Sequence, residues 1–490
     1  MNYKMVVYVL GRIIQIIGIF LLIPAVVGVI YREKEILAIA IIAVLSIVVG
    51  GFLDRKKPKN SQIRAKEGFV ITAFTWIVMS IVGAIPFYVT GYIPSITDAV
   101  FETASGFTTT GASILTDIEA LPHCLLFWRS FTHWIGGMGI LVFMLAFVSS
   151  SADEMNIMRA ESPGPSVEKM VPKVRETAFM LYSIYTVLTL TLVMALVIAG
   201  MPVFDSFCVS FGTAGTGGFA TKGDSIASYS KACQVIITIG MMLFGVNFNV
   251  YSLIVMKKYK ELIHAEEVIA YFIIYAVATL IVTLGTYDGF INLMGWQGAE
   301  SFNSFGQALQ QSSFQVASVM TTTGFATTDF DKWANVPKLV MVGVMFIGAC
   351  AGSTGGGMKV SRWLLYFKQM RRELQSYIHP SSVRSIWLDG KVVDKDTLRT
   401  TNVYLMAYMF TFLVSLVLIS FDGHDLITSF TAVTATINNI GPGLSIVGPT
   451  GNFAGFSNLS KWVFIFDMIA GRLELFPFLI MLSLSTWRKK

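Results

Sequence analysis

Charged residues are scarce in this sequence, and cysteines and histidines are few. Asp, Glu, Lys and Arg make up only 13% of the 490 residues, whereas 54% are apolar. A water-soluble domain of this length does not carry such a balance, because its surface needs more polar groups. The shortage of charge therefore excludes a soluble protein and indicates a polytopic membrane protein.

The four cysteines and five histidines do not form a recognisable metal site. No two cysteines make a C-x-x-C pair and the histidines are scattered, so the usual spacing of metal ligands is missing. We interpret the cysteines as apolar packing residues. The sequence also lacks the polar cluster near one membrane interface that an embedded enzyme would need, so we predict no enzymatic activity.

The net charge of +6 does not indicate a nucleic-acid partner. Basic residues fall in short loops between apolar runs rather than on one face, and membrane lipid is the expected surrounding. The stretch 54–66 holds six basic residues and marks a cytoplasmic loop. Acidic residues concentrate in the alternate loops, so both termini are predicted to be cytoplasmic.

A short glycine motif occurs four times along the chain. The copies are FTTTGA at 107–112, GTGGF at 215–219, SVMTTTGF at 318–325 and INNIGP at 437–442. Aligning them places Gly111, Gly218, Gly324 and Gly441 in register, at separations of 107, 106 and 117 residues. These spacings exceed those of solenoid repeats, so each unit must be a whole module, and four modules suggest pseudo-fourfold symmetry around one pore.

Each motif follows an apolar run of about a dozen residues, which is shorter than the ~20 needed to cross a bilayer. Longer apolar runs flank it, so the pattern predicts a span, a re-entrant helix, a loop and a second span. Non-helical backbone at membrane depth is tolerated where it lines water, and glycine lets a loop turn its carbonyls inward. Carbonyl oxygens suit an alkali cation. The predicted ion-binding residues are Thr109, Thr110, Gly111, Thr216, Gly217, Gly218, Thr322, Thr323, Gly324, Asn439, Ile440 and Gly441.

The predicted fold is an all-α polytopic membrane protein with ten full spans and four re-entrant helices. A two-helix hairpin at 1–67 precedes the modules, because its two apolar runs are not followed by a motif. The pore modules are predicted at 68–160, 161–262, 263–398 and 399–490, the third with a cytoplasmic linker at about 368–398. Asp98 and Asp205 each lie thirteen residues before a motif glycine. We expect both to cap the start of a short helix.

A second glycine-rich segment, 348–357, lies inside an otherwise apolar run. Five glycines and a Ser-Thr pair cannot remain regular helix, and we predict a flexible barrier below the filter rather than a simple kink. A phosphate-binding loop is disfavoured because Met358 separates Gly357 from Lys359. The predicted gating residues are Gly348, Gly352, Ser353, Thr354, Gly355, Gly356, Gly357 and Lys359, together with Arg472.

Arg472 is predicted to be a charge in the middle of an apolar span. Such residues usually face a cavity or a partner. One interpretation is a positive group near the pore that limits cation occupancy. The other is an ion pair with Asp467 or Glu474. We interpret Arg129 and His133, one helical turn apart, as structural residues.

The motifs together resemble those of the Trk/Ktr/HKT superfamily of potassium transporters, and in particular its TrkH-type members. Beyond the four copies, the likeness includes WIGGMG at 134–139, RAESPGP at 159–165, the segment 348–359 and GRLE at 471–474. It covers nearly the whole chain. The N-terminal hairpin is similar to that of the Trk type, since Ktr-type relatives generally lack it.

The resemblance implies potassium uptake by a homodimer in a bacterial inner membrane, with one pore per protomer. It also implies control by a cytosolic ring of nucleotide-binding, Trk-A-type regulatory subunits, which we expect to dock near 151–174 and 368–398. Segment 348–357 would be the gate, with Arg472 near the filter. Glycine rather than serine at Gly111 implies a preference for K+. The doubled glycine at Gly217 and Gly218 departs from the family pattern and leaves the ligands of that loop open.

A different class of function remains an alternative: an ion-coupled secondary transporter, either a K+/H+ or K+/Na+ symporter or a carrier of an organic solute. Its broken helices would bind the substrate at the midplane of the membrane. That class predicts inverted repeats and an acid in the cavity, for which Asp467 is the candidate.

Overall fold

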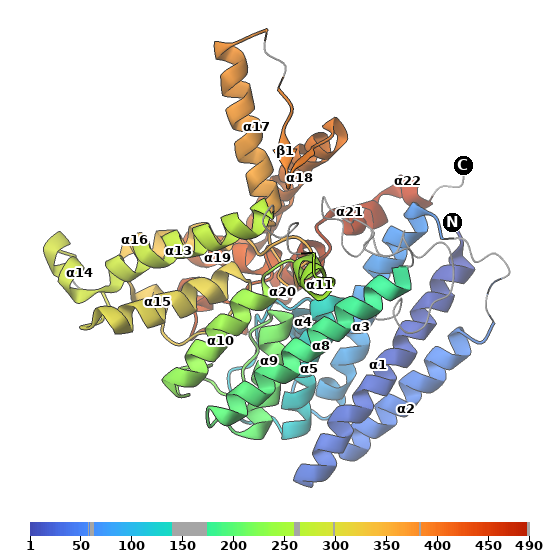
Figure 1. Cartoon of the computed structure of the whole chain (residues 1–490). Helices are drawn as coiled ribbons and strands as arrows, with labels where there is room; N and C mark the ends of the chain where they lie inside the picture. Colours follow the sequence, from blue (N-terminus) through green and yellow to red (C-terminus); the bar gives the residue numbers. More distant parts are fainter. Residues whose placement is uncertain are drawn as a thin grey trace.

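The computed structural model describes residues 1–56, 58, 63–139, 174–258, 265–296, 299–381 and 384–487. Nearly all of the predicted docking segment 151–174, and with it the RAESPGP motif, lies outside the described residues. The architecture is helical, and its elements repeat in groups along the chain (Figure 1).

The chain begins with two antiparallel helices, α1 (Tyr3–Tyr31) and α2 (Ile36–Leu53), which pack against each other at one side of the molecule (Figure 1). Glycines make the contact close: a Cβ on Gly50 would lie 2.6 Å from the backbone nitrogen of Gln15. Small residues allow helix backbones to approach in this way in membranes. These helices correspond to the predicted N-terminal hairpin.

Four groups of helices follow, each containing a first helix, a short helix and a second helix. The first helices are α3 (Ala65–Val89), α8 (Val174–Ile198), α13 (Glu266–Thr286) and α18 (Lys395–Ile419). The short helices are α4 (Ile96–Phe107), α9 (Val203–Gly215), α15 (Phe305–Met320) and α19 (Leu426–Ile437). The second helices are α5 (His123–Met138), α10 (Lys231–Phe244) with α11 (Phe248–Val255), α16 (Asn335–Met345) with α17 (Val360–Ile378), and α20 (Asn458–Arg472) with α21 (Phe476–Leu482). The remaining short helices are α14 (Asp288–Met294) and α22 (Leu484–Trp487).

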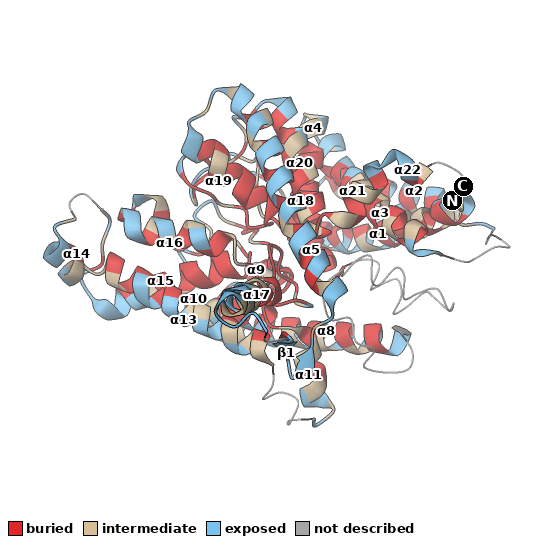
Figure 2. Ribbon diagram, turned by 90° about the horizontal axis from the view of Figure 1, so that it is seen from above, coloured by how far each residue is buried: buried red, intermediate tan, exposed pale blue. Residues whose placement is uncertain are grey.

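The same packing pattern recurs in every group. Each short helix contacts the first and second helices of its own group. It also contacts the second helix of the preceding group, in the pairs α5 with α9, α10 with α15, α16 with α19, and α20 with α4. The last pair returns to the first group, so the contacts form a closed cycle. The short helices are largely buried, and Figure 2 shows buried residues concentrated on the inner sides of the helices.

The second helices differ from the predicted uninterrupted spans, because three of the four are broken within the described residues. Within the described residues, six helices are long and apolar enough to cross a membrane, or seven if α10 and α11 count as one span. That pair is bent by 87°. Two other second helices are also interrupted: α16 and α17 lie on either side of a break at 346–359, and α20 and α21 lie on either side of a break at 473–475. Glycine-rich sequence explains the first of these breaks, and positive φ angles at Glu474 and Leu475 accompany the second.

The prediction that Asp98 and Asp205 cap short helices is also wrong. The hydroxyl of Ser95 accepts the N–H of Asp98 at the start of α4, and Pro202 precedes α9 without a side-chain cap. Both aspartates are the third residue of their helix, and they bind other side chains: Asp98 pairs with Lys461 at 2.6 Å, and Asp205 accepts from Thr221 at 2.9 Å. The two aspartates occupy the same position in their helices, but each one binds a side chain from outside its own helix.

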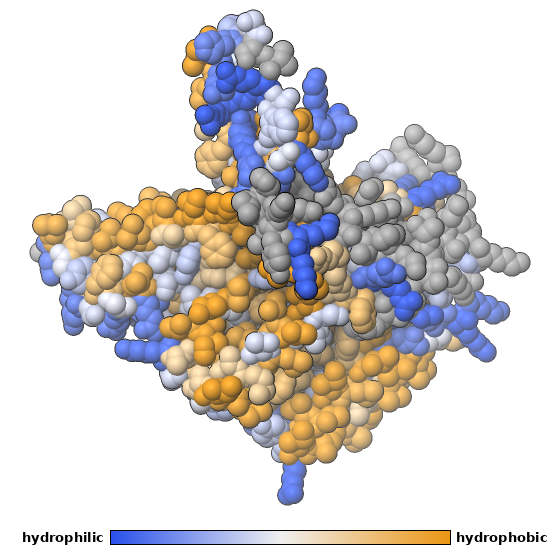
Figure 3. Space-filling model, in the orientation of Figure 1, coloured by the Kyte–Doolittle hydropathy of each residue, from blue (hydrophilic) through white to orange (hydrophobic). Residues whose placement is uncertain are grey.

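The predicted cytoplasmic linker contains ordered structure. Helix α17 projects from the body of the molecule, beside a two-stranded antiparallel hairpin of β1 (Trp387–Leu388) and β2 (Lys391–Val392) (Figure 1). The hairpin is an exception to the all-α prediction. Figure 3 shows polar residues gathered on this projection, whereas apolar residues cover broad bands of the helices below it.

A buried ion pair connects the short and second helices of the first group, and it generates a stability prediction. Glu102 accepts from Arg129 at 2.6 Å, and its side chain is fully buried. We expect Glu102→Ala to destabilise the protein by about 3–5 kcal/mol, because it leaves Arg129 as an uncompensated buried charge. The measurement is the apparent unfolding temperature of the purified protein in detergent.

The control is Lys332→Ala, which removes a pair with Asp329 from a lysine that is 66% exposed. We expect that change to cost about 0–1 kcal/mol. Equal shifts in unfolding temperature for the two variants would contradict the prediction.

Candidate functional site

The four glycine motifs form loops at the C-terminal ends of the four short helices. We call them the motif loops: 108–111, 216–218, 321–324 and 438–441. They share a backbone conformation in which a left-handed residue is followed, two positions later, by a glycine with positive φ. The left-handed residues are Thr109, Thr216, Thr322 and Asn439, with φ of 56°, 56°, 58° and 55°. The glycines are Gly111, Gly218, Gly324 and Gly441, with φ of 78°, 76°, 84° and 95°.

This repeat includes the second loop. Thr216 and Gly218 take the same two conformations as the corresponding residues elsewhere, so Gly217 occupies the position of Thr110 and Thr323. The doubled glycine changes the side chain at that position and leaves the backbone pattern intact.

The motif glycines make close contacts from loop to loop. A Cβ on any of the four would come closer than 3.0 Å to the carbonyl oxygen of the residue before the glycine in the next loop. The contacts run from Gly111 to Gly217, from Gly218 to Thr323, from Gly324 to Ile440 and from Gly441 to Thr110. We call these four glycines the ring glycines and the four oxygens the ring carbonyls. The contacts close on themselves, so the structure brings all twelve predicted ion-binding residues into one assembly.

Side chains of the motif loops also connect them. Asn439 donates from Nδ2 to Thr110 Oγ1 at 2.9 Å and to the carbonyl of Met468 at 2.8 Å. The fourth loop is thereby tied to the first. Thr108 and Thr110 share a hydrogen bond of 2.8 Å, and the equivalent pair in the third loop, Thr321 and Thr323, shares one of 2.7 Å.

Arg129 and His133 on α5 support the second motif loop, in agreement with a structural role. The ring of His133 contacts the carbonyl of Gly106 through Nδ1 at 2.7 Å, and its Nε2 accepts the N–H of Phe219 at 3.1 Å. With one nitrogen donating and the other accepting, the imidazole is neutral. Arg129 lies over the ring of Phe219 and donates to the carbonyl of Ala220 at 3.0 Å.

The predicted gating segment forms a non-helical connection between α16 and α17. We call residues 346–359 the glycine loop. It lies against the third and fourth motif loops: the N–H of Gly356 donates to Thr322 Oγ1 at 2.7 Å. A Cβ on Gly356 would lie 2.8 Å from the carbonyl of Asn438. The glycines therefore permit the backbone to reach the motif loops.

The same loop enters the break between α10 and α11. The N–H of Cys350 donates to the carbonyl of Gly245 at 3.1 Å, and the N–H of Phe248 donates to the carbonyl of Gly352 at 2.9 Å. Thr354 Oγ1 donates to the carbonyl of Phe244 at 3.2 Å. The 87° bend thus exposes backbone groups that the glycine loop satisfies.

Two basic side chains bind carbonyls of the glycine loop. Lys359 Nζ donates to the carbonyls of Gly355 and Gly356. Arg472 donates to the carbonyl of Thr354 at 2.6 Å and to Thr109 Oγ1 at 3.1 Å. It also donates to the carbonyls of Gly136 and Gly137 on α5, at 2.6 Å each. Arg472 therefore joins the glycine loop to the first motif loop.

The expected surroundings of Arg472 need correction. It is the last residue of α20 and lies at a break, not in the middle of a span. Glu474 forms a buried ion pair with Arg362, and Asp467 accepts from Ser415 Oγ at 2.7 Å. The pairing of Arg472 with Asp467 or Glu474 stays a prediction.

Sequence reasoning missed Arg362 and Glu267 as residues of this site. Glu267, at the start of α13, accepts two backbone N–H groups from the glycine loop and the start of α17. From the sequence alone, the adjacent acids at 266 and 267 indicate no more than a favourable start of a helix. The contact with the loop spans more than 80 residues of sequence, so no local pattern reveals it.

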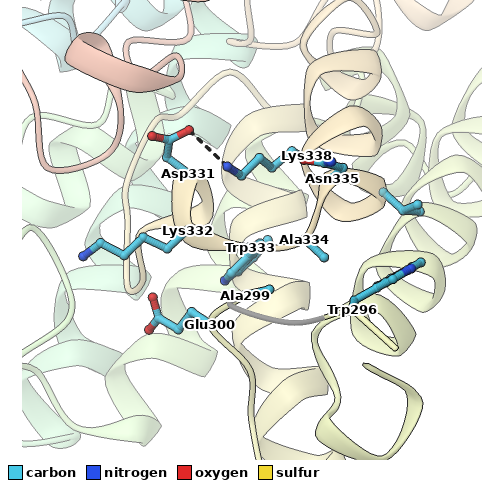
Figure 4. A pocket seen from close by; sticks show the side chains of 10 residues that line it. Trp296, Ala299, Glu300, Asp331, Lys332, Trp333, Ala334, Asn335 and Lys338 are labelled. Atoms are coloured by element: carbon cyan, nitrogen blue, oxygen red, sulfur yellow. Dashed lines mark ion pairs between the residues drawn. The ribbon is translucent and has the colours of Figure 1, made fainter. Parts of the chain in front are cut away.

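A separate pocket of about 770 Å³ lies between α14 and α16, away from the motif loops (Figure 4). Its lining comes from Trp296, Ala299 and Glu300 and from residues 331–336 and 338, and it includes an ion pair between Lys338 and Asp331 at 3.6 Å. The motif and glycine loops contribute none of its ten lining residues. Among the described residues, no group of three or more His, Cys, Asp or Glu side chains could hold a metal ion.

Comparison with known proteins assigns the chain to a family. A family model described as "TrkH: Cation transport protein" matches residues 35–487. The Trk system potassium uptake protein TrkH of Salmonella typhimurium is 35% identical over 496 residues, which cover 100% of both chains. The Trk system potassium uptake protein TrkG of Escherichia coli is 30% identical over 499 residues, covering 99% of each.

A solved structure gives the same assignment. The crystal structure of the potassium transporter TrkH from Vibrio parahaemolyticus is similar with a TM-score of 0.87 and 31% identity, covering 100% of both chains. This likeness agrees with several long apolar helices and very little strand in the described residues. The predicted family is therefore confirmed, and the chain belongs to the TrkH family of cation transport proteins.

Proposed function

We propose that the protein takes up K+ across a bacterial inner membrane through a filter formed by the four motif loops. The observation that carries the proposal is the closed cycle of contacts between ring glycines and ring carbonyls. Four backbones that meet in this way can present peptide oxygens to one dehydrated monovalent cation. The short helices also end at the loops, so their C-terminal partial charges favour a cation there.

Side chains in the motif loops support a backbone filter. Thr110, Thr323 and Asn439 use their side chains to hold neighbouring loops or their own loop. The hydroxyls of Thr110 and Thr323 and the amide nitrogen of Asn439 are therefore already engaged. The positions equivalent to Thr110 and Thr323 in the other two loops carry different side chains, Gly217 and Ile440. Carbonyl ligands tolerate such variation, whereas a site made of side chains does not.

The glycine loop serves as the gate in this proposal. It lies directly against the third and fourth motif loops, and it is held by Lys359 and Arg472 through its own carbonyls. Non-helical backbone rich in glycine can rearrange with little steric cost. Movement of the loop away from the motif loops would open the path, and Arg472 would hold it closed.

The proposed assembly is a homodimer with one pore in each protomer, surrounded by lipid and with both termini in the cytoplasm. A cytosolic ring of Trk-A-type, nucleotide-binding subunits would control the gate. The projecting α17 and the hairpin offer a polar surface for such a partner (Figure 3). The names of the relatives favour uptake of K+, and glycine at Gly111 agrees with that preference.

The second candidate is an ion-coupled transporter. Asp467 is the observation that favours it, because this buried acid accepts from Ser415 and its second oxygen has no partner among the described residues. Flux measured against an imposed proton or sodium gradient separates the two mechanisms. K+ flux through a channel-like path depends only on the K+ gradient and the membrane potential.

Substitution of a ring glycine tests the filter. We expect Gly324→Ser to abolish or severely reduce rescue of a potassium-uptake-deficient bacterium at low external K+. The reason is that Gly324 has a φ of 84° and its Cβ would overlap the carbonyl oxygen of Ile440. Growth rate and K+ content of the cells give the measurement.

A matched control separates this clash from backbone strain. Gly91 has a φ of 79° and nothing within 4 Å of an added Cβ, so Gly91→Ser carries the strain alone. We expect it to retain rescue. If Gly324→Ser rescues growth as well as the unchanged protein, the filter assignment is wrong.

Substitution of Arg472 tests the gate. We expect Arg472→Ala to raise K+ leak through reconstituted vesicles by about tenfold, because the loss of its bonds to Thr354 and Thr109 releases the glycine loop. Arg472→Lys should raise it less, since a lysine keeps the charge but cannot reproduce the fork of donors. Leak equal to that of the unchanged protein in both variants would exclude this role.

A further inference from the structure

Two adjacent glutamates begin α13, and they bind different parts of the molecule. Glu267 is 6% exposed. Its Oε1 accepts the N–H of Ala351 at 2.7 Å and the N–H of Ser361 at 3.0 Å. Ala351 belongs to the glycine loop, and Ser361 lies in the first turn of α17. A single carboxylate oxygen on α13 therefore holds the chain on both sides of the four glycines between 352 and 357.

These two bonds satisfy backbone groups that need a partner. The N–H of Ser361 lies in the first turn of a helix, where no intrahelical acceptor is available. The N–H of Ala351 lies in non-helical backbone and is buried. Loss of the acceptor would leave both groups unpaired, at a cost large enough to shift the loop.

Glu266 connects the same helix end to the exposed hairpin. Its carboxylate pairs with Lys368 on α17, and Lys368 Nζ also donates to the carbonyl of Trp387 in β1 at 2.6 Å. The backbone N–H of Glu266 donates to Asp389 Oδ1 at 2.8 Å, so a hairpin residue caps the start of α13.

The hairpin turn places Asp389 for this contact. Asp389 and Gly390 have φ of 50° and 73°, as expected of the two central residues of a tight two-residue turn. Burial raises the pKa of the Asp389 carboxyl above its ordinary value, while its bond to the N–H of Glu266 opposes that rise.

We propose that Glu267 is a positioning residue for the glycine loop and that Glu266, through Lys368 and Asp389, connects that loop to the β1–β2 hairpin. A displacement of the hairpin would move the first turn of α13 and with it the acceptor that holds Ala351 and Ser361. This inference rests on the proposed function for its consequence in transport, but the mechanical link can be measured without transport.

The first experiment compares Glu267→Ala with Glu267→Gln in the purified full-length chain. Hydrogen–deuterium exchange over 346–361 is the primary measurement. In Glu267→Ala we expect exchange about tenfold faster at each of the two freed amides, the ratio for loss of roughly one hydrogen bond per amide, with unchanged exchange in the motif loops. Glu267→Gln keeps an oxygen that can accept both N–H groups, so its exchange should remain near that of the unchanged protein.

Transport then shows whether the held loop is the gate. In vesicles without any regulatory protein, we expect Glu267→Ala to raise K+ flux and to leave the ratio of K+ to Na+ flux unchanged, because the ring carbonyls are not altered. Faster exchange with unchanged flux would contradict the gating role while leaving the positioning role intact. Unchanged exchange, or equal exchange in the Ala and Gln variants, would overturn the positioning role.

A second pair of variants tests the hairpin. Asp389→Gly keeps a residue suited to positive φ and removes the carboxylate, whereas Asp389→Asn keeps an oxygen acceptor and also tolerates positive φ. We expect severalfold faster exchange over 346–361 in the first and little change in the second. If Asp389→Gly leaves exchange there unaltered, the connection to the hairpin is wrong.

If Glu267→Ala fails to fold, Glu267→Asp supplies the same test of the positioning role, because its shorter side chain displaces the carboxylate.

Discussion

Four stretches of backbone meet so closely in this protein that no side chain fits at the points of contact. Each ring glycine lies against a ring carbonyl of the next loop, and the cycle closes. This constraint explains the positive φ at all four glycines and the left-handed residue two positions before each of them. It also requires the short helices to end at one level, because a longer helix would carry its loop past the others.

The second helices adapt to the same constraint. Gly136 on α5 and Gly471 on α20 lie against the carbonyls of Phe107 and Ile437, the last residues of short helices in their own groups. In the second, third and fourth groups the second helix breaks. The glycine loop fills the space between the break at Gly245 and the motif loops. The basic side chains of Lys359 and Arg472 bind backbone carbonyl oxygens of the glycine loop. The glycine loop is therefore held by directional bonds that can be broken separately.

Sequence patterns predicted the parts of this arrangement that depend on local chemistry. The four motifs, the short helices before them and the non-helical segment 348–357 follow from apolar length and glycine content. Long-range contacts were not predictable in this way. Asp98 has the signature of a helix cap, yet it pairs with Lys461 because Ser95 already caps the helix. The contacts of Asn439 and Glu267 depend on which helices become neighbours, and the breaks in the second helices depend on the loops they accommodate.

The central claim is that the ring carbonyls surround a dehydrated monovalent cation. Anomalous diffraction from crystals of the protein grown with Rb+ or Tl+ tests it most directly. The account predicts a peak at the centre of the four motif loops, within coordination distance of the carbonyl oxygens of Thr110, Gly217, Thr323 and Ile440. A well-ordered filter without a peak there, or a peak held instead by side-chain carboxylates such as Asp467, would contradict it.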